Sequence, residues 1–172
     1  GASRLPRKAQ APVRGCLMAD DRPARVDEAV VREHMEEVIE SHEQAFETFF
    51  FARFLGLNFE YLPAEAPDAD KEVCRLTFEV TDMLRNPQGS LHGGVMASAM
   101  DISMGHLVNK IAGAGATIEL KVQFMRPVME GLVTCEGRFT KKGRSLSFME
   151  SRLMGPDGKL AALATATWKM PG

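Results

Sequence analysis

The chain has 172 residues, of which 45% are hydrophobic and 26% charged, a balance that suits one globular domain and excludes a wholly disordered chain. Its 21 Lys and Arg residues against 23 Asp and Glu give a net charge of -2, which excludes the strongly basic surface of a dedicated nucleic-acid binder. Three widely spaced cysteines predict neither a disulfide framework nor a zinc site, and they favour a cytoplasmic location. The sequence has no run of about 18 apolar residues, which predicts no membrane span.

Residues 1–25 are rich in Arg and Pro and poor in large apolar residues, which predicts a basic, poorly ordered tail. An organellar presequence and a natural start at Met18 are alternatives for this tail. A helical extension follows over residues 26–44, with Asp27 as its N-cap and Ser41 as the cap of a second helix that ends at Gly56. A cluster of phenylalanines at helical spacing favours packing in the core over the lining of a pocket. Its members are Phe46, Phe49, Phe50, Phe51 and Phe54.

Strand signals begin after this helical region. Residues 57–62 and 73–80 are short candidate strands. Residues 93–111 predict a helix that is apolar on all sides and is therefore enclosed. Strict alternation over residues 117–125 predicts a half-buried strand, and three more strands follow over residues 132–140, 146–154 and 160–169. This order predicts an α+β fold in which an antiparallel sheet curls around one central helix, within a main domain of residues 45–172.

The segment from Asn86 to Asp101 carries the candidate chemistry. His92-Gly93-Gly94 stands at the start of the buried helix, where unpaired N–H groups and the helix dipole favour negative charge on a ligand oxygen. Close packing of the two glycines against the sheet is the alternative. Asp101 stands in the middle of the same helix, where an ionisable side chain is costly unless it is paired or used. Gly93 and Asp101 are eight positions apart, hence about 12 Å along the axis, so their cooperation on one substrate indicates two chains of a dimer.

These motifs resemble those of a known family. Asn-Pro-x-Gly-x-Leu-His-Gly-Gly is followed nine residues after the His by Asp, then by Thr117, by Phe-Met-Arg-Pro at 124–127 and by Gly-Arg-Ser-Leu-Ser-Phe at 143–148. Together they resemble the hotdog-fold acyl-CoA thioesterases of the phenylacetyl-CoA type over roughly residues 45–169. The resemblance implies a hotdog fold, subunits paired edge to edge as a homodimer or as a tetramer of two dimers, and active sites at the dimer interface.

The resemblance also implies a role for each motif residue. The N–H of Gly93, with His92 beside it, polarises the thioester carbonyl, and Asp101 of the neighbouring subunit acts as a general base or as a nucleophile. Asn86 orients water or the carbonyl, and Thr117 hydrogen-bonds the attacking water or the carboxylate. The phosphates of coenzyme A need cations, although a solvated hairpin tip is the alternative role for nearby basic residues. The candidates are Arg126, Lys141, Lys142 and Arg144.

The sequence therefore predicts hydrolysis of an aromatic or medium-chain acyl-CoA to a free acid and coenzyme A. No metal or redox cofactor is expected, because a thioester already has a good leaving group. A non-catalytic acyl-CoA-binding module of the same fold is one alternative. A hydratase or dehydratase, in which His92 and Asp101 act as acid and base on one substrate, is another. Neither a nucleic acid nor a membrane is expected as a partner.

Overall fold

The computed structural model describes residues 26–40, 43–46, 48–63 and 72–171, so the tail predicted over residues 1–25 and the cap predicted at Ser41 lie outside the described residues. The elements follow one another as α1 (Glu28–Glu40), α2 (Phe50–Phe54), β1 (Asn58–Leu62), β2 (Val73–Glu79), the 3-10 turn η2 (Asp82–Leu84), α3 (Gly93–Ala112), β3 (Ala116–Phe124), β4 (Leu132–Lys141), β5 (Leu146–Met154) and β6 (Leu160–Lys169). Each predicted strand is present, with ends within one residue of the predicted ones.

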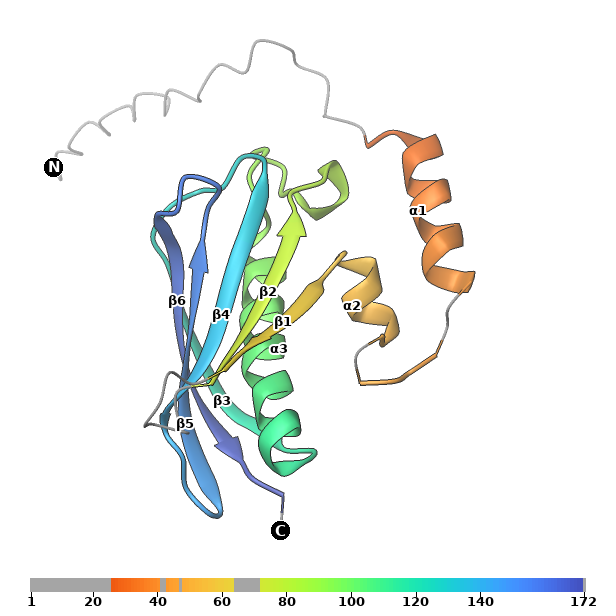
Figure 1. Cartoon of the computed structure of the whole chain (residues 1–172). Helices are drawn as coiled ribbons and strands as arrows, with labels where there is room; N and C mark the ends of the chain where they lie inside the picture. Colours follow the sequence, from red (N-terminus) through yellow and green to blue (C-terminus); the bar gives the residue numbers. More distant parts are fainter. Residues whose placement is uncertain (1–25, 41–42, 47, 64–71, 172) are drawn as a thin grey trace, which may run out of the picture.

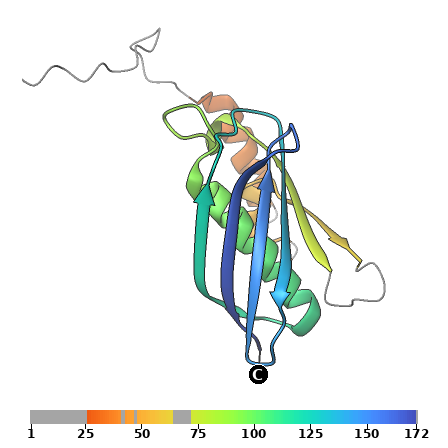
Figure 2. The same cartoon turned by 90° about the vertical axis from the view of Figure 1, so that its left-hand side faces the viewer.

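The strands form one antiparallel sheet in the order β1-β2-β4-β5-β6-β3. Side chains on β4 and β5 alternate between a buried inner face and a more exposed outer face, as a strand with one side against a core does. The sheet curves around α3 (Figure 1), and β3 and β1 lie at its two edges (Figure 2). The predicted antiparallel sheet around one central helix is therefore confirmed.

Close backbone contacts fix α3 on the sheet. Gly137 of β4 lies so near Ser103 that a Cβ on this glycine would stand 2.6 Å from the Ser103 carbonyl carbon. Gly105 of the helix approaches the ring of Trp168 on β6 in the same way. The predicted enclosure of α3 is confirmed at these contacts, whereas Asp101 on the same helix is only half-buried. The helix is thus held firmly while one of its faces keeps access to solvent.

The helical extension begins as predicted. The carboxylate of Asp27 accepts a hydrogen bond from the N–H of Ala29 at 2.8 Å, so Asp27 caps the N-terminus of α1. Gly56, whose φ of +68° suits glycine, follows the end of α2 as predicted. Both ends of this region could be predicted because a cap and a terminating glycine are local signals.

The prediction of helix over the residues just before Phe50 is wrong. The chain makes a turn there, in which the N–H of Thr48 bonds to the carbonyl of Ala45, and Phe49 is extended. The rings of Phe46 and Phe49 lie against His106 of α3 instead of forming a helical stripe. Because Phe46 stays 42% exposed, the expected packing of this cluster in the core holds only in part.

The expectation of a half-buried β3 needs correction as well. Ile118 and Phe124 are 58% and 54% exposed, and only Leu120 and Val122 are partly buried. The cause is the position of β3 at the edge of the sheet, beyond the strands that α3 covers most closely. The chain therefore carries an edge strand whose apolar side chains are largely uncovered.

The described cysteines, Cys74 on β2 and Cys135 on β4, are both buried and free. Cys16 lies outside the described residues. Over the part of the chain that the structure describes, no helix combines the length and the apolar character needed to cross a membrane.

Candidate active site

A histidine caps the start of α3. Nδ1 of His92 accepts a hydrogen bond from the N–H of Gly94 at 2.9 Å, and a Cβ on Gly94 would stand 3.0 Å from that same atom. Helix geometry leaves the N–H of Gly93, at the first helical position, without an acceptor inside the helix. This N–H is the donor that the helix start can offer to a ligand, and the helix dipole adds positive potential there.

Asn86 shapes the loop before this helix. Its Oδ1 accepts hydrogen bonds from the N–H groups of Gln88 and Ser90, and its Nδ2 donates to the Ser90 hydroxyl at 2.9 Å. A primary amide has two N–H donors, so these bonds use one of the two that Asn86 carries. Asn86 lines an open cavity of about 350 Å³ together with Gly93 and Arg126. The structure thus brings three predicted site residues together at this end of α3.

Asp101 and Thr117 meet at the middle of α3. The hydroxyl of Thr117 donates a hydrogen bond to Asp101 Oδ1 at 2.8 Å. Partial burial raises the pKa of Asp101 above its ordinary value, and the hydrogen bond from Thr117 opposes that rise. A carboxylate whose pKa is raised accepts a proton more readily than an exposed aspartate does.

A β-bulge turns the Thr117 side chain toward the helix. Thr117 pairs with Trp168 of β6 and Glu119 pairs with Thr167, so Ile118 is an extra residue on β3. Simple alternation along β3 would have placed Thr117 on the outer face with Glu119. The sequence alone gave no sign of the bulge, because its alternation has no exception there.

Within one chain, the site residues at the start of α3 lie apart from the pair of Asp101 and Thr117. Gly93 and Asp101 are eight positions apart on the unbroken helix α3, so at ~1.5 Å per residue their backbones are about 12 Å apart. Gly93 and Asn86 line one cavity, whereas Asp101 lines another. One chain therefore does not present the Gly93 N–H and the Asp101 carboxylate to a single carbonyl group.

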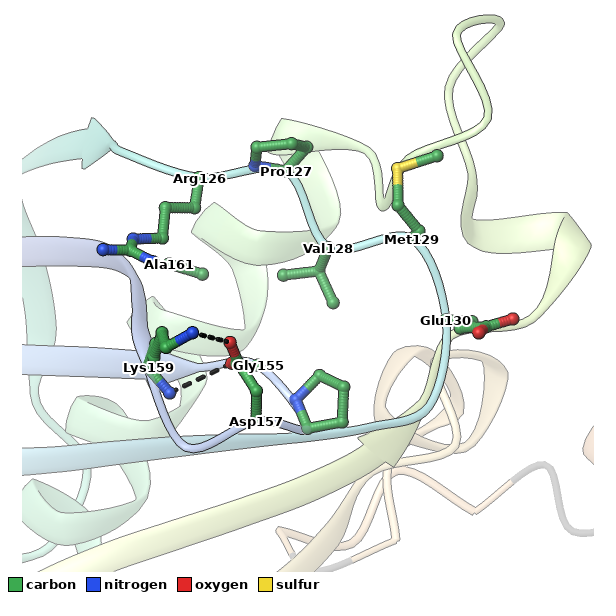
Figure 3. A pocket seen from close by; sticks show the side chains of 10 residues that line it. Arg126, Pro127, Val128, Met129, Glu130, Gly155, Asp157, Lys159 and Ala161 are labelled. Atoms are coloured by element: carbon green, nitrogen blue, oxygen red, sulfur yellow. Dashed lines mark hydrogen bonds and ion pairs between the residues drawn. The ribbon is translucent and has the colours of Figure 1, made fainter.

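The candidate phosphate-binding cations occupy opposite ends of the sheet. Arg126 follows β3 and lines a second cavity of about 220 Å³ against the β5–β6 turn, where Lys159 forms an ion pair with Asp157 at 3.2 Å (Figure 3). Lys159 was not among the predicted cations. The remaining candidates are exposed at the end of β4 and on the turn that follows it, at the end of the sheet where Leu146 pairs with Lys169. They are Lys141, Lys142 and Arg144.

A buried histidine that was not among the predicted site residues lies near Asp101. His106 is 2% exposed, its ring stacks on Phe59 at a centroid distance of 4.0 Å, and its Nδ1 lies 3.2 Å from the Tyr61 hydroxyl. Burial lowers the pKa of His106 to about 4, so the ring is neutral at pH 7. Ile102 is next to Asp101 in the sequence and four positions before His106, so Ile102 and His106 lie on one face of α3. This spacing was the signal in the sequence that could have pointed to His106.

The chemical capacity of the site follows from these groups. An N–H donor at a helix start stabilises negative charge on a carbonyl oxygen. A carboxylate with a raised pKa can take a proton from water or attack a carbonyl carbon itself. Among the residues that the structure describes, no group of three or more His, Cys, Asp or Glu side chains is placed to hold a metal ion.

Known proteins resemble this chain in sequence and in fold. The sequence profile of the thioesterase superfamily matches residues 88–162. A putative esterase of Saccharolobus solfataricus is 33% identical over 117 residues, which are 67% of this chain and 73% of that protein. Acyl-coenzyme A thioesterase THEM4 of Bos taurus is 34% identical over 106 residues, which are 60% of this chain and 42% of that protein. The structure of BH2602 from Bacillus halodurans with CoA has a TM-score of 0.72 at 18% identity, over 87% of this chain and 96% of that one, and this likeness confirms the predicted fold.

Proposed function

The chain belongs to the hotdog-fold thioesterase superfamily, and from this premise we propose that it hydrolyses an acyl-CoA thioester to a free acid and coenzyme A. The observation that carries the proposal is the hydrogen-bonded pair of Asp101 and Thr117, together with the N–H of Gly93 on the helix that carries Asp101, where the two backbones are about 12 Å apart. A carboxylate held by a hydroxyl and a free N–H at a helix start suit the attack of water on a thioester. The name of the relative from Bos taurus supports coenzyme A as the thiol.

Pairing of two chains through β3 would join the separated groups. β3 is an edge strand with exposed apolar side chains. Thr117 stands near its start, whereas Phe124 at its end lies 3.4 Å from the Cβ position of Gly93. Antiparallel pairing of two β3 strands sets the start of one against the end of the other. It therefore brings Asp101 of one chain toward the partner subunit's Gly93.

In such a shared site, the N–H of the partner subunit's Gly93 stabilises the negative charge that develops on the thioester oxygen. Asp101 takes a proton from water while the water oxygen bonds to the carbonyl carbon. The C–S bond then breaks, and coenzyme A leaves as a thiolate that takes up a proton. In a second route with the same products, the Asp101 carboxylate attacks first and water hydrolyses the anhydride. A single turnover in isotope-labelled water places label in Asp101 when water attacks the aspartyl carbonyl of that anhydride, and it never does so in the first route.

Arg126 would serve the coenzyme A part of the substrate. It lines the same cavity as Gly93, so it lies on the side of the thioester where the N–H acts. A guanidinium binds phosphate oxygens through paired hydrogen bonds. Antiparallel pairing of β3 places the β4–β5 turn of one chain at the same end of the dimer as the partner subunit's Arg126. The dimer thereby gathers basic residues that one chain keeps at opposite ends of its sheet.

Thiol release from a saturated acyl-CoA tests the proposal. Wild-type protein should release free coenzyme A, and Asp101→Asn, which keeps the shape of the side chain, should lose at least about a hundredfold in kcat/KM. Glu79→Gln is the matched control, because Glu79 is an exposed carboxylate at the end of β2, and this variant should keep full activity. Binding of acyl-CoA without thiol release would instead indicate a binding module. Reaction only with an unsaturated acyl-CoA, without thiol release, would indicate a hydratase.

A mixing experiment tests whether the site is shared. Gly93→Pro removes the N–H, and proline suits this position because the first helical position tolerates it and His92 before it is extended, with φ -64° and ψ 132°. Gly93→Pro and Asp101→Asn should each be nearly inactive alone. Random exchange of their subunits gives mixed dimers with one intact site and should restore about a quarter of the wild-type activity. Mixed dimers without recovered activity would contradict a shared site.

A further inference from the structure

An apolar cavity opens directly beside Asp101. Its volume is about 320 Å³, and its walls come from α3, from β6 and from the chain just before α2. Helix α3 contributes Asp101, Ile102, Gly105 and His106 to the wall. The described lining residues include neither Lys nor Arg, so the cavity is unsuited to the phosphates of coenzyme A. It is suited to an apolar group that lies next to the Asp101 carboxylate.

Phe46 and Phe49 form the outer side of this cavity. They precede residues 88–162, which match the superfamily profile, by about forty positions. Their ring centroids lie 4.5 Å and 5.9 Å from that of His106, on whose ring Phe59 also stacks. These aromatic contacts hold the chain before α2 against α3. Because the ring of Phe46 is partly exposed, it separates the cavity from solvent without belonging to the sealed core.

Two ring nitrogens in the wall are buried without a hydrogen-bond partner in the described part of the chain. They are Nε2 of His106 and Nε1 of Trp168, and both side chains are more than nine-tenths buried. Both atoms expose almost no surface, so neither ring offers a hydrogen bond to a molecule in the cavity. The surface that these two rings present to the cavity is therefore carbon, which suits an apolar group.

We propose that this cavity binds the acyl group of the substrate and that Phe46 and Phe49 are the wall that limits acyl size. The inference rests on the proposed hydrolase function, because the acyl group is the part of an acyl-CoA that is joined directly to the carbonyl served by Asp101. At ~30 Å³ for each water-sized group, a volume of about 320 Å³ holds about ten chain atoms. On this volume, the cavity suits medium-chain and phenyl-substituted acyl groups better than palmitoyl and longer chains.

Changing the wall should change the preferred chain length. The wild-type kcat/KM, measured by thiol release over the series from butyryl-CoA to stearoyl-CoA, should peak at octanoyl-CoA or decanoyl-CoA and fall at least about tenfold by palmitoyl-CoA. Phe46→Ala removes a ring and enlarges the cavity by on the order of 100 Å³, which is room for about three further carbons. Its optimum should therefore move to longer chains. Phe46→Trp narrows the cavity and should move the optimum to shorter chains.

Phe51→Ala is the matched control, because Phe51 is 44% exposed on α2 and does not line the cavity. Its chain-length profile should equal that of the wild type. Equal wild-type kcat/KM on octanoyl-CoA and palmitoyl-CoA, or an unchanged profile in both Phe46 variants, overturns the inference and leaves the hydrolase function standing. Absence of thiol release at every chain length overturns the proposed function and the inference with it. Phe46→Trp keeps an aromatic ring against His106, so it supplies a folded variant even where Phe46→Ala proves unstable.

Discussion

Removing the Thr117 hydroxyl tests how Asp101 is activated. The hydroxyl donates to Asp101 Oδ1 at 2.8 Å, and this bond opposes the rise that burial imposes on the pKa of the carboxyl group. Thr117→Val keeps the branched shape of the side chain but removes the donor. The pKa of Asp101 then rises further, so a smaller fraction of the protein carries the carboxylate at a given acidic pH. Under the proposed function, the acidic limb of the hydrolysis profile moves to higher pH.

The size of the effect follows from the strength of this hydrogen bond. A bond to a charged group contributes about 1.5–3 kcal/mol where it is well buried. Asp101 is only half-buried, and solvent reduces that contribution to about 1 kcal/mol. Because ~1.4 kcal/mol corresponds to a factor of ten, kcat/KM should fall about fivefold on the acidic limb. The loss should be smaller on the alkaline plateau, where the carboxylate is fully ionised in both proteins.

The assay is thiol release from octanoyl-CoA, followed as kcat/KM from acidic to alkaline pH for the wild type and Thr117→Val. Thr117→Ser retains a hydroxyl donor and should restore the wild-type profile. A loss of equal size at every pH refutes the reasoning, because it shows that Thr117 positions water or substrate without changing the proton affinity of Asp101. An unchanged profile in Thr117→Val refutes it as well, since the hydrogen bond would then have no effect on the reaction.

Three further predictions concern stability and assembly. Asp101→Asn should raise the free energy of unfolding at pH 7, because the raised pKa of Asp101 means that the folded state carries the ionised carboxylate at a cost. Thermal denaturation should show that this gain disappears below the pKa of an unfolded carboxyl group, where the side chain at position 101 is uncharged in both proteins. Gly137→Ala should destabilise the fold by about 1–3 kcal/mol in urea denaturation, because its new Cβ meets the Ser103 backbone at 2.6 Å. A urea midpoint equal to that of the wild type would contradict this packing. Ile118→Glu should lower both the dimer fraction in gel filtration and kcat/KM, and a fully active dimer would argue against pairing through β3.

The central helix and the strands could be predicted because their signals are local. Apolar alternation assigns the inner face of a strand residue by residue, and the predicted bounds of β5 and β6 agree with the structure. The start of α3 could be predicted from His92-Gly93-Gly94, because a helix cap depends only on neighbouring residues. The hydrogen bond from Thr117 to Asp101 agrees with a role that the family resemblance implied, whereas alternation along the strand did not predict it.

Other features depend on contacts between distant parts of the chain. The bulge that turns Thr117 toward α3 arises from pairing with β6, about fifty residues later. Phe46 leaves the helical pattern because its ring packs on His106, sixty positions along the sequence. The separation of Arg126 from Lys142 follows from the order of strands in the sheet, which composition does not reveal. Residue type and spacing identified candidates, and the tertiary fold decided which of them meet.

The rigidity of α3 links the fold to the proposed chemistry. Gly93 and Asp101 stand on one unbroken helix that Gly137 holds tightly against the sheet, so no loop motion within a chain brings both onto one carbonyl. Under the proposed function, the complete site exists only in the dimer, and the exposed side chains of β3 are the surface that forms it. Phe46, by contrast, stands outside the segment that carries the reacting groups. Acyl size can therefore change through that wall while the N–H of Gly93 and the carboxylate of Asp101 stay in place.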